Sequence, residues 1–456
     1  MDQLRLFHDL TGEIETTETA DLHSHLHWTQ PSAQSLAHLL SYHFLQNEIR
    51  AAGAPDAVFR LEDREERFRA LLPWFARIAN VGTSYSLRRI LKDLYGMKEE
   101  TVGPENADWL AGRVAERAAD PEWTREVLRR HARLRRVFVS TQLESGGQDP
   151  EWKAVLANTP EAARGADLFH LAGETGFVSD QYLSWAMRPY GRRRYPPAAS
   201  ARDWMDRQWS FVNAGNRDHL KSLMVWINVR IRHFPGGMDE VEPLAEAAWR
   251  RGVENEGIGL SPDEGLALRM YGLYAMIKNA RDAGLPLQIF LGSVNQGGDR
   301  GPWGGWQANH VDYDPSTLRE FGCLVHDNPG VRFDFLQGCV QNGQELAIMA
   351  KMRPNVGLCG IWWHSMYPAY LRRILSERLD AVPLTKTCLF FSDAYMAEWC
   401  YGKRRLVERE FAYVLAERVA FGYFSRADAS RVIHAWMREN PARVYGVAEL
   451  AGPETA

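Results

Sequence analysis

Two histidines near the start of the chain have the spacing needed to bind one metal ion. His23 and His25 lie in the segment Thr-Ala-Asp-Leu-His-Ser-His, residues 19–25. Residues two apart on a strand point to the same face, so the two imidazoles would lie side by side. Ring nitrogens of histidine are good ligands for divalent transition metals. A His-x-His pair also arises by chance at polar strand ends, so a metal site requires a further ligand.

A candidate third ligand lies near the other end of the chain. An apolar run begins at Cys388 and leads to Ser392 and Asp393. Two histidines and a carboxylate leave metal positions open for water or substrate, and this set suits zinc best. Manganese, iron and nickel also accept it. The alternative role for Asp393 is to cap the N-terminus of the helix that follows.

The elements that must position these residues alternate between apolar strands and helices. Besides the opening segment, the strand candidates are residues 137–141, 168–171, 223–227, 287–292, 332–336, 356–361 and 388–393. Strands that are apolar throughout and alternate with helices are typical of a parallel sheet. Eight such units predict an α/β fold, a (β/α)8 TIM barrel, whose chemistry lies at the carboxyl ends of the strands. The first and eighth strands are neighbours in a closed barrel, which would bring Asp393 to the two histidines.

Helical periodicity accounts for most of the remaining chain. The segments expected to be helical are 32–52, 62–98, 105–135, 262–284, 315–327, 341–352, 367–380, 398–421 and 426–438. The first three fall between the first two strands and are far longer than a simple crossover requires. We therefore expect one barrel domain over residues 1–456, with a helical insertion over 32–135 at the barrel mouth.

Composition narrows the class of protein. The net charge of −4 argues against a nucleic-acid binder. The five cysteines are scattered and odd in number, which indicates buried thiols in a reducing compartment. We expect no signal peptide and no membrane span, because the N-terminus is polar and no apolar run reaches 18 residues. A cytoplasmic enzyme is the default expectation, and a homo-oligomer is compatible with it.

Several short motifs beside the candidate ligands occur together in one known family. They are residues 21–26 (Asp-x-His-x-His-Leu), Tyr42, the pair Trp362-Trp363 after the seventh strand, Ser392-Asp393 after the eighth, and the closing residues 440–446. This set resembles the uronate isomerases (glucuronate and galacturonate isomerases) of the amidohydrolase superfamily, with this chain as a divergent member. The resemblance spans most of the chain and is firmest at its two ends and over residues 355–395.

The resemblance implies a metal-dependent aldose–ketose isomerase acting on a sugar acid or a related small polar substrate. His23, His25 and Asp393 would bind the metal. Asp393 or Tyr42 would move a proton between neighbouring carbons of the substrate. The expected substrate-binding residues are Trp362, Trp363, His364, Tyr395 and Arg300, the last in the glycine-rich segment 293–306, which is either an active-site lid or a surface loop.

Two positions depart from the family pattern. Phe290 stands where a histidine is usual at the end of the fifth strand, and Tyr395 stands where an arginine would hold the substrate carboxylate. A phenol cannot replace a guanidinium as a bidentate anion ligand. Either another cation holds the carboxylate (Arg372, Arg373 and Lys403 are candidates), or the substrate is not a hexuronate. A hydrolase or lyase of the same superfamily and a non-catalytic metal- or sugar-binding relative are the alternatives.

Overall fold

Eight parallel strands form one sheet whose order follows the chain. The computed structural model describes residues 2–26, 30–142, 169–174, 200–203, 205–206, 221–227, 231–254, 261–295, 309–311 and 313–451. Within them the strands of this sheet are β1 (Thr19–Ser24), β2 (Leu134–Gln142), β3 (Phe169–Glu174), β4 (Leu223–Ile227), β5 (Leu287–Leu291), β8 (Phe333–Gln337), β9 (Val356–Ile361) and β10 (Thr387–Cys388). Each strand pairs in parallel with the next, as the alternating pattern predicted.

The sheet closes where the segment after β10 returns to β1. The backbone N–H of Asp393 donates to the carbonyl of His23 at 2.9 Å, and the N–H of His25 donates to the carbonyl of Ala394 at 2.8 Å. The chain therefore folds as a (β/α)8 barrel, and the first and last strand positions are neighbours as expected.

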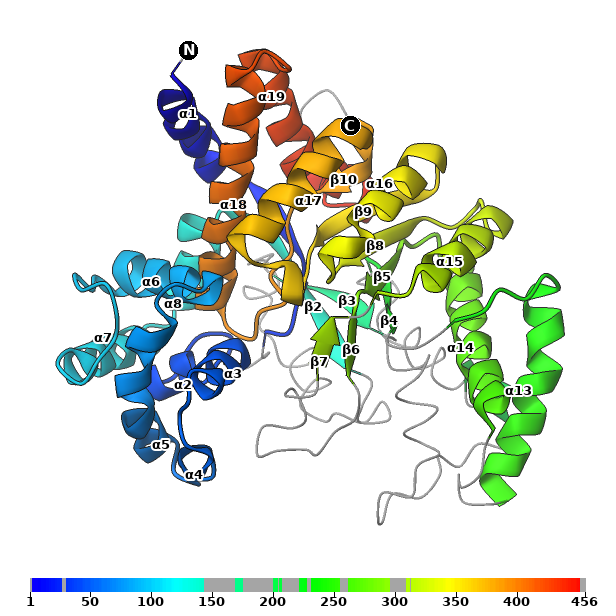
Figure 1. Ribbon diagram of the computed structural model, residues 1–456, viewed down its shortest axis with the longest axis horizontal. Helices are drawn as coiled ribbons and strands as arrows, with labels where there is room; N and C mark the ends of the chain where they lie inside the picture. Colours follow the sequence, from blue (N-terminus) through cyan, green and yellow to red (C-terminus); the bar gives the residue numbers. More distant parts are fainter. Residues whose placement is uncertain are drawn as a thin grey trace.

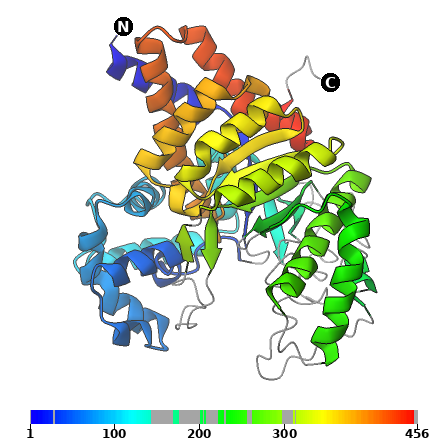
Figure 2. The same cartoon turned by 45° about the vertical axis from the view of Figure 1, so that its right-hand side comes forward.

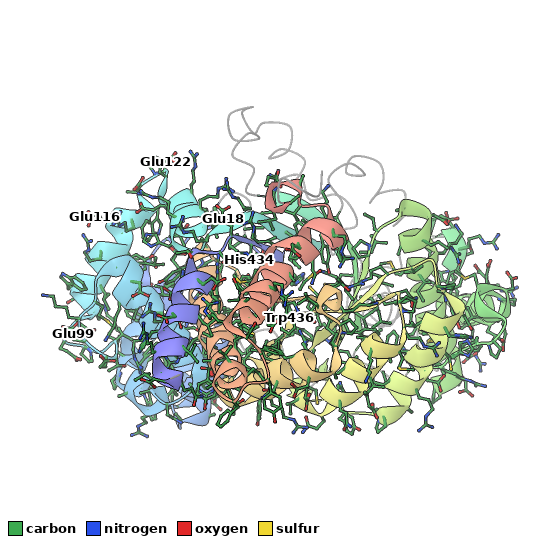
Figure 3. The ribbon with its side chains drawn as sticks, turned by 90° about the horizontal axis from the view of Figure 1, so that it is seen from above. Glu18, Glu99, Glu116, Glu122, His434 and Trp436 are labelled. Atoms are coloured by element: carbon green, nitrogen blue, oxygen red, sulfur yellow. The ribbon has the colours of Figure 1, made fainter. Side chains whose placement is uncertain are left out.

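The regular part of the eighth strand is shorter than predicted. We expected a strand over residues 388–393, but ladder pairing with β9 stops at Cys388. The next N–H, that of Leu389, donates at 3.0 Å to the carbonyl of Trp436 instead. Trp436 belongs to η9 (Ala435–Glu439), the turn that follows the last long helix; Figure 3 labels it beneath His434 in that segment. A tertiary contact thus ends a strand that the apolar run alone would continue.

Long helices follow the strands on the outside of the barrel. They are α13 (Gly237–Glu254), α14 (Pro262–Ala283), α15 (Pro315–Asp327), α16 (Gly343–Met352), α17 (Pro368–Ala381), α18 (Ala397–Ala420), α19 (Arg426–His434) and α20 (Asn440–Tyr445). Another helix, α1 (Gln3–Thr16), precedes β1 and buries Leu6, Leu10 and Ile14. Helices α1, α13 and α20 were not predicted from the sequence. None of the described helices has the length and apolar character needed to cross a membrane.

A group of helices separates β1 from β2. They are α2 (Leu36–Leu40), α3 (His43–Ala51), α4 (Asp56–Phe59), α5 (Arg64–Leu71), η1 (Leu72–Ile78), α6 (Gly82–Tyr95), α7 (Ala107–Ala118), α8 (Trp123–Arg125) and η2 (Glu126–His131). In Figures 1 and 2 this group lies on one side of the strands, and α13 and α14 lie on the other. The expected single helix over 32–52 is divided at Tyr42, the residue that precedes α3. The single barrel domain with its insertion over 32–135 stays a prediction.

The interior of the barrel is filled by side chains from alternate strand positions. Phe138, Phe290 and Leu336 are fully buried there and belong to one apolar cluster with Tyr445 of α20. The Tyr445 hydroxyl donates at 2.8 Å to Asp334, near the start of β8. This end of the interior is thereby filled. His23 and Ser24 end β1 and lie at the opposite, carboxyl end, where barrel enzymes place their chemistry.

Gly360 of β9 is required where the segment after β10 closely approaches this strand. Its φ is +59°, and a Cβ at this position would lie 2.0 Å from the ring of Phe391. Gly446 is a matched control, since its φ is +65° and a Cβ there would meet no atom within 4 Å. We predict that Gly446→Ala costs about 1–2 kcal/mol for the left-handed backbone.

Gly360→Ala should add about 1–3 kcal/mol to that cost, because the side chain must also displace a buried ring. Melting temperatures of the two variants and the parent protein test this difference. Equal losses in the two variants would show that the contact with Phe391 relaxes freely.

Candidate metal centre

His23 and His25 face each other at the carboxyl end of β1. Their Nε2 atoms lie 3.2 Å apart, and their ring planes are perpendicular. Strict alternation would not turn His23 inward, because Ala20 and Leu22 already belong to the interior cluster. The pairing of β1 with β2 shifts register between Asp21 and Ser24. This irregularity accounts for the inward position of His23, whose ring packs against Phe290.

Asp393 completes the group from the other side of the barrel seam, the place where the segment after β10 pairs with β1. Its Oδ1 atom lies 3.3 Å from Nε2 of His23 and 3.1 Å from Nε2 of His25. Its Oδ2 atom accepts a hydrogen bond of 3.1 Å from the indole N–H of Trp362, which fixes the carboxylate. The φ of Asp393 is +52°, a left-handed backbone that only glycine adopts freely. Asp393 therefore faces the histidines rather than capping α18, whose N-cap residue is Met396.

The protonation states of these residues suit metal binding. Burial lowers the pKa of His23 to about 4, so its imidazole is neutral at pH 7. Burial alone would raise the pKa of Asp393. The hydrogen bonds from His23 and His25 outweigh this effect and leave the pKa well below its usual range. A neutral imidazole and an ionised carboxylate are the ligand forms of these side chains.

The geometry of the three ligand atoms also fits one small divalent ion. Among the described residues, His23, His25 and Asp393 form the group whose ligand atoms all lie within 4.8 Å of one another. A tetrahedral zinc with bonds of about 2.0 Å has ligand–ligand edges of about 3.3 Å. The separations of 3.1, 3.2 and 3.3 Å match such edges. The residues present therefore fit a metal ion with open positions beside them.

Aromatic residues surround the imidazoles. Tyr395 stacks on His25, with ring centroids 5.1 Å apart and an angle of 16° between the planes. Phe290 packs at 4.7 Å from the ring of His23, where the family pattern led us to look for a histidine. Both departures from that pattern therefore lie in contact with the candidate ligands.

Tyr42 lies next to the centre, at the break between α2 and α3. It is buried and stacks on Trp399 at 4.2 Å. Its hydroxyl has no hydrogen-bond partner among the described residues. Burial raises the pKa of Tyr42 well above its usual value, and the negative charge of Asp393 raises it further. The phenol therefore stays protonated at neutral pH and can donate a hydrogen bond.

His43 was not among the sequence candidates. Its ring lies edge-on to Tyr395 at 5.6 Å. Desolvation lowers the pKa of His43 to about 3, and the charge of Lys403 contributes in the same direction. The feature of the sequence that could have identified His43 as a candidate is its position directly after Tyr42.

The remaining candidates are spread around the mouth. Trp362 is buried and contacts Asp393 directly, whereas His364 lies half-buried in η7 (Trp363–Ser365). Trp363 begins that turn. The hairpin of β6 (Ser293–Asn295) and β7 (Asn309–Val311) leads into and out of the glycine-rich segment. Arg300 lies outside the described residues.

The three cations considered for a substrate carboxylate occupy different surroundings. Arg372 forms an ion pair with Glu410, and Arg373 pairs with Glu377 at 2.9 Å on the same helix. Lys403 of α18 is buried directly behind Asp393. Of these three residues, Lys403 alone touches the candidate centre.

Comparison with known proteins supports the fold. The sequence matches no family model, and no curated protein is significantly similar to it. Glucuronate isomerase from Caulobacter crescentus aligns with a TM-score of 0.78 at 16% identity, covering 99% of this chain and 97% of that chain.

Uronate isomerases from two other bacteria give the same result. The protein from Thermotoga maritima aligns with a TM-score of 0.77 at 15% identity, covering 97% of both chains. The protein from Bacillus halodurans aligns with a TM-score of 0.73 at 14% identity, covering 98% of this chain and 97% of that chain. The chain therefore has the fold of the uronate isomerases over almost its whole length, as the sequence resemblance implied.

Removal of either histidine should abolish metal binding. We predict that His23→Ala and His25→Ala each weaken zinc binding by more than about 100-fold, since loss of a ligand exceeds the usual effect of an outer contact. His326→Ala is the control, because His326 lies on α15 and contacts Arg353 at the surface. Metal content after dialysis, with circular dichroism to verify folding, measures the effect. Full occupancy in the His23→Ala, His25→Ala double variant would contradict the site.

Proposed function

We propose that the protein is a metal-dependent aldose–ketose isomerase acting on a sugar acid or a related small polar substrate. The observation that carries the proposal is the convergence of His23, His25 and Asp393 at the barrel mouth. Their ligand atoms come from the two sides of the barrel seam, on a fold shared with uronate isomerases. A small-molecule substrate fits such a site, and cytoplasmic location and a homo-oligomer stay predictions.

His23, His25 and Asp393 would hold the divalent metal, which when bound would polarise the substrate oxygens and acidify the neighbouring C–H bond. The ionised Asp393 is the group we propose to accept the proton from carbon 2 and return it to carbon 1. The proton of the carbon-2 hydroxyl would pass to the carbon-1 oxygen in the same reaction. Tyr42 is protonated at neutral pH, so its hydroxyl would donate a hydrogen bond to a substrate oxygen. Trp362 would hold the Asp393 carboxylate in place while the proton moves.

A metal-dependent hydrolase or lyase is the second candidate. The observation that favours it is Tyr395, a neutral side chain stacked on His25 where an isomerase of this kind would carry an arginine. In that reaction Asp393 would act as the general base toward water rather than toward a C–H bond. The two candidates differ in whether a substrate carboxylate is bound beside the metal.

Solvent isotope exchange distinguishes the reactions. Zinc- or manganese-loaded protein incubated with glucuronate, galacturonate and other sugar acids in D2O should introduce deuterium at carbon 1 or 2, visible by proton NMR. Tyr42→Phe keeps the ring stack on Trp399, so it should retain metal but lose about 10²-fold or more in kcat. Absence of both ketose product and deuterium exchange throughout the panel in metal-loaded protein would overturn the isomerase. Hydrolysis of lactones or amides in a parallel panel would favour the second candidate.

The role of Tyr395 can be tested by restoring the family residue. Tyr395→Arg should tighten binding of glucuronate or galacturonate by about tenfold or more, since a charge-assisted hydrogen bond contributes about 1.5–3 kcal/mol. Tyr395→Phe, which keeps a ring for the stack on His25, is the control and should leave affinity nearly unchanged. Isothermal titration with each metal-loaded variant measures the difference. Unchanged affinity in Tyr395→Arg would place the substrate carboxylate elsewhere.

A further inference from the structure

Lys403 is a buried cation that lies behind the candidate metal centre and has no role in the proposed reaction. It lies on α18 and is 6% exposed. Its ammonium donates to the backbone carbonyls of Ser392 and Asp393, the latter at 3.4 Å. The rings of Tyr42 and Phe44 lie 5.3 and 5.5 Å from its Nζ atom. The amine therefore acts on the backbone that carries Asp393.

That backbone has an unusual conformation. A residue other than glycine with a φ of +52° is strained, so neighbouring contacts must hold it. Irregular backbone also leaves the sheet ladder, and its buried polar groups need other partners. At residues 392–394 these partners are Asp21 for the N–H of Ser392, His23 for the N–H of Asp393, the Ser392 hydroxyl for the N–H of Ala394, and His25 for the carbonyl of Ala394.

The carbonyls of Ser392 and Asp393 remain, and Lys403 donates to both. A buried carbonyl that loses its partner destabilises the fold, because its lost hydration is no longer offset by a hydrogen bond. Without the ammonium, the simplest relief is rotation of the peptide units on either side of Asp393. Such a rotation would carry the carboxylate away from the Nε2 atoms of His23 and His25.

We propose that Lys403 is a positioning residue that holds the strained backbone of Asp393 and so fixes the third metal ligand. This inference rests on the metal centre proposed above. It assigns Lys403 a role on the protein backbone instead of the role of substrate-carboxylate ligand. The ammonium also repels a bound dication, so a site selected for metal affinity alone would not place a lysine here. Its hydrogen bonds to the two carbonyls explain why a lysine is present here.

The test is cobalt binding, because the visible spectrum of Co²⁺ reports the number and arrangement of its ligands. Lys403→Met removes both the hydrogen bonds and the charge, and Lys403→Gln keeps an amide donor without charge. We expect Lys403→Met to change the cobalt spectrum and to weaken binding by up to about 100-fold, and Lys403→Gln to weaken it by about tenfold.

Arg404→Met is the matched control. Arg404 is equally buried on the same helix, but it contacts Glu408 and the carbonyl of Thr17, away from the centre. This variant should lower stability and leave the cobalt spectrum and affinity unchanged.

Each outcome decides the question. The proposal is overturned if Lys403→Met binds Co²⁺ at least as tightly as the parent protein and gives the same spectrum. The ammonium would then act only through its charge. Where Lys403→Met does not fold, Lys403→Gln decides, and an affinity within twofold of the parent protein overturns it. Failure of the parent protein itself to bind Co²⁺ would reject the metal centre instead.

Discussion

The candidate centre depends on the backbone hydrogen bonds that join the first and last strand positions of the barrel. Asp393 donates to the His23 carbonyl, and His25 donates to the Ala394 carbonyl. The same residues carry the three ligand side chains, so closing the barrel and assembling the ligands are one structural event. The separations of 3.1–3.3 Å between ligand atoms are therefore set mainly by backbone. Trp362 and Lys403 then limit the freedom of the carboxylate and of its peptide units.

Much of this arrangement could be predicted from residue types and spacing. The period and composition of the apolar runs gave every strand of the barrel sheet, and residues 356–361 match β9 at both ends. The ligand pair was readable because His23 and His25 are two apart. The end of the eighth strand was not predictable, because it depends on Leu389 meeting the Trp436 carbonyl from a distant turn. The local sequence around Leu389 does not indicate that such a distant partner exists.

Side-chain environments were also beyond the sequence. From the sequence, Phe290 and Tyr395 could be recognised only as departures from a family pattern. Nothing in the sequence indicated which residues their rings would contact. In the structure each ring packs on a different candidate ligand, Phe290 on His23 and Tyr395 on His25. Apolar rings against metal-binding imidazoles restrict ring rotation and exclude water, which affects the chemistry of any bound metal. The two departures therefore change the surroundings of the centre while leaving its ligand set intact.

The distance along the chain between the two halves of the centre has a consequence for biosynthesis. Asp21 and Ser392, which are hydrogen-bonded beside the ligands, are separated by 371 positions in sequence. A growing polypeptide cannot form the candidate site until Asp393 has been made, so a metal bound there would be loaded only after that point in translation. Because the three candidate ligands come together only in the closed barrel, bound metal would shift the folding equilibrium toward the folded state. Metal supply and the yield of folded protein should therefore be coupled in the cell.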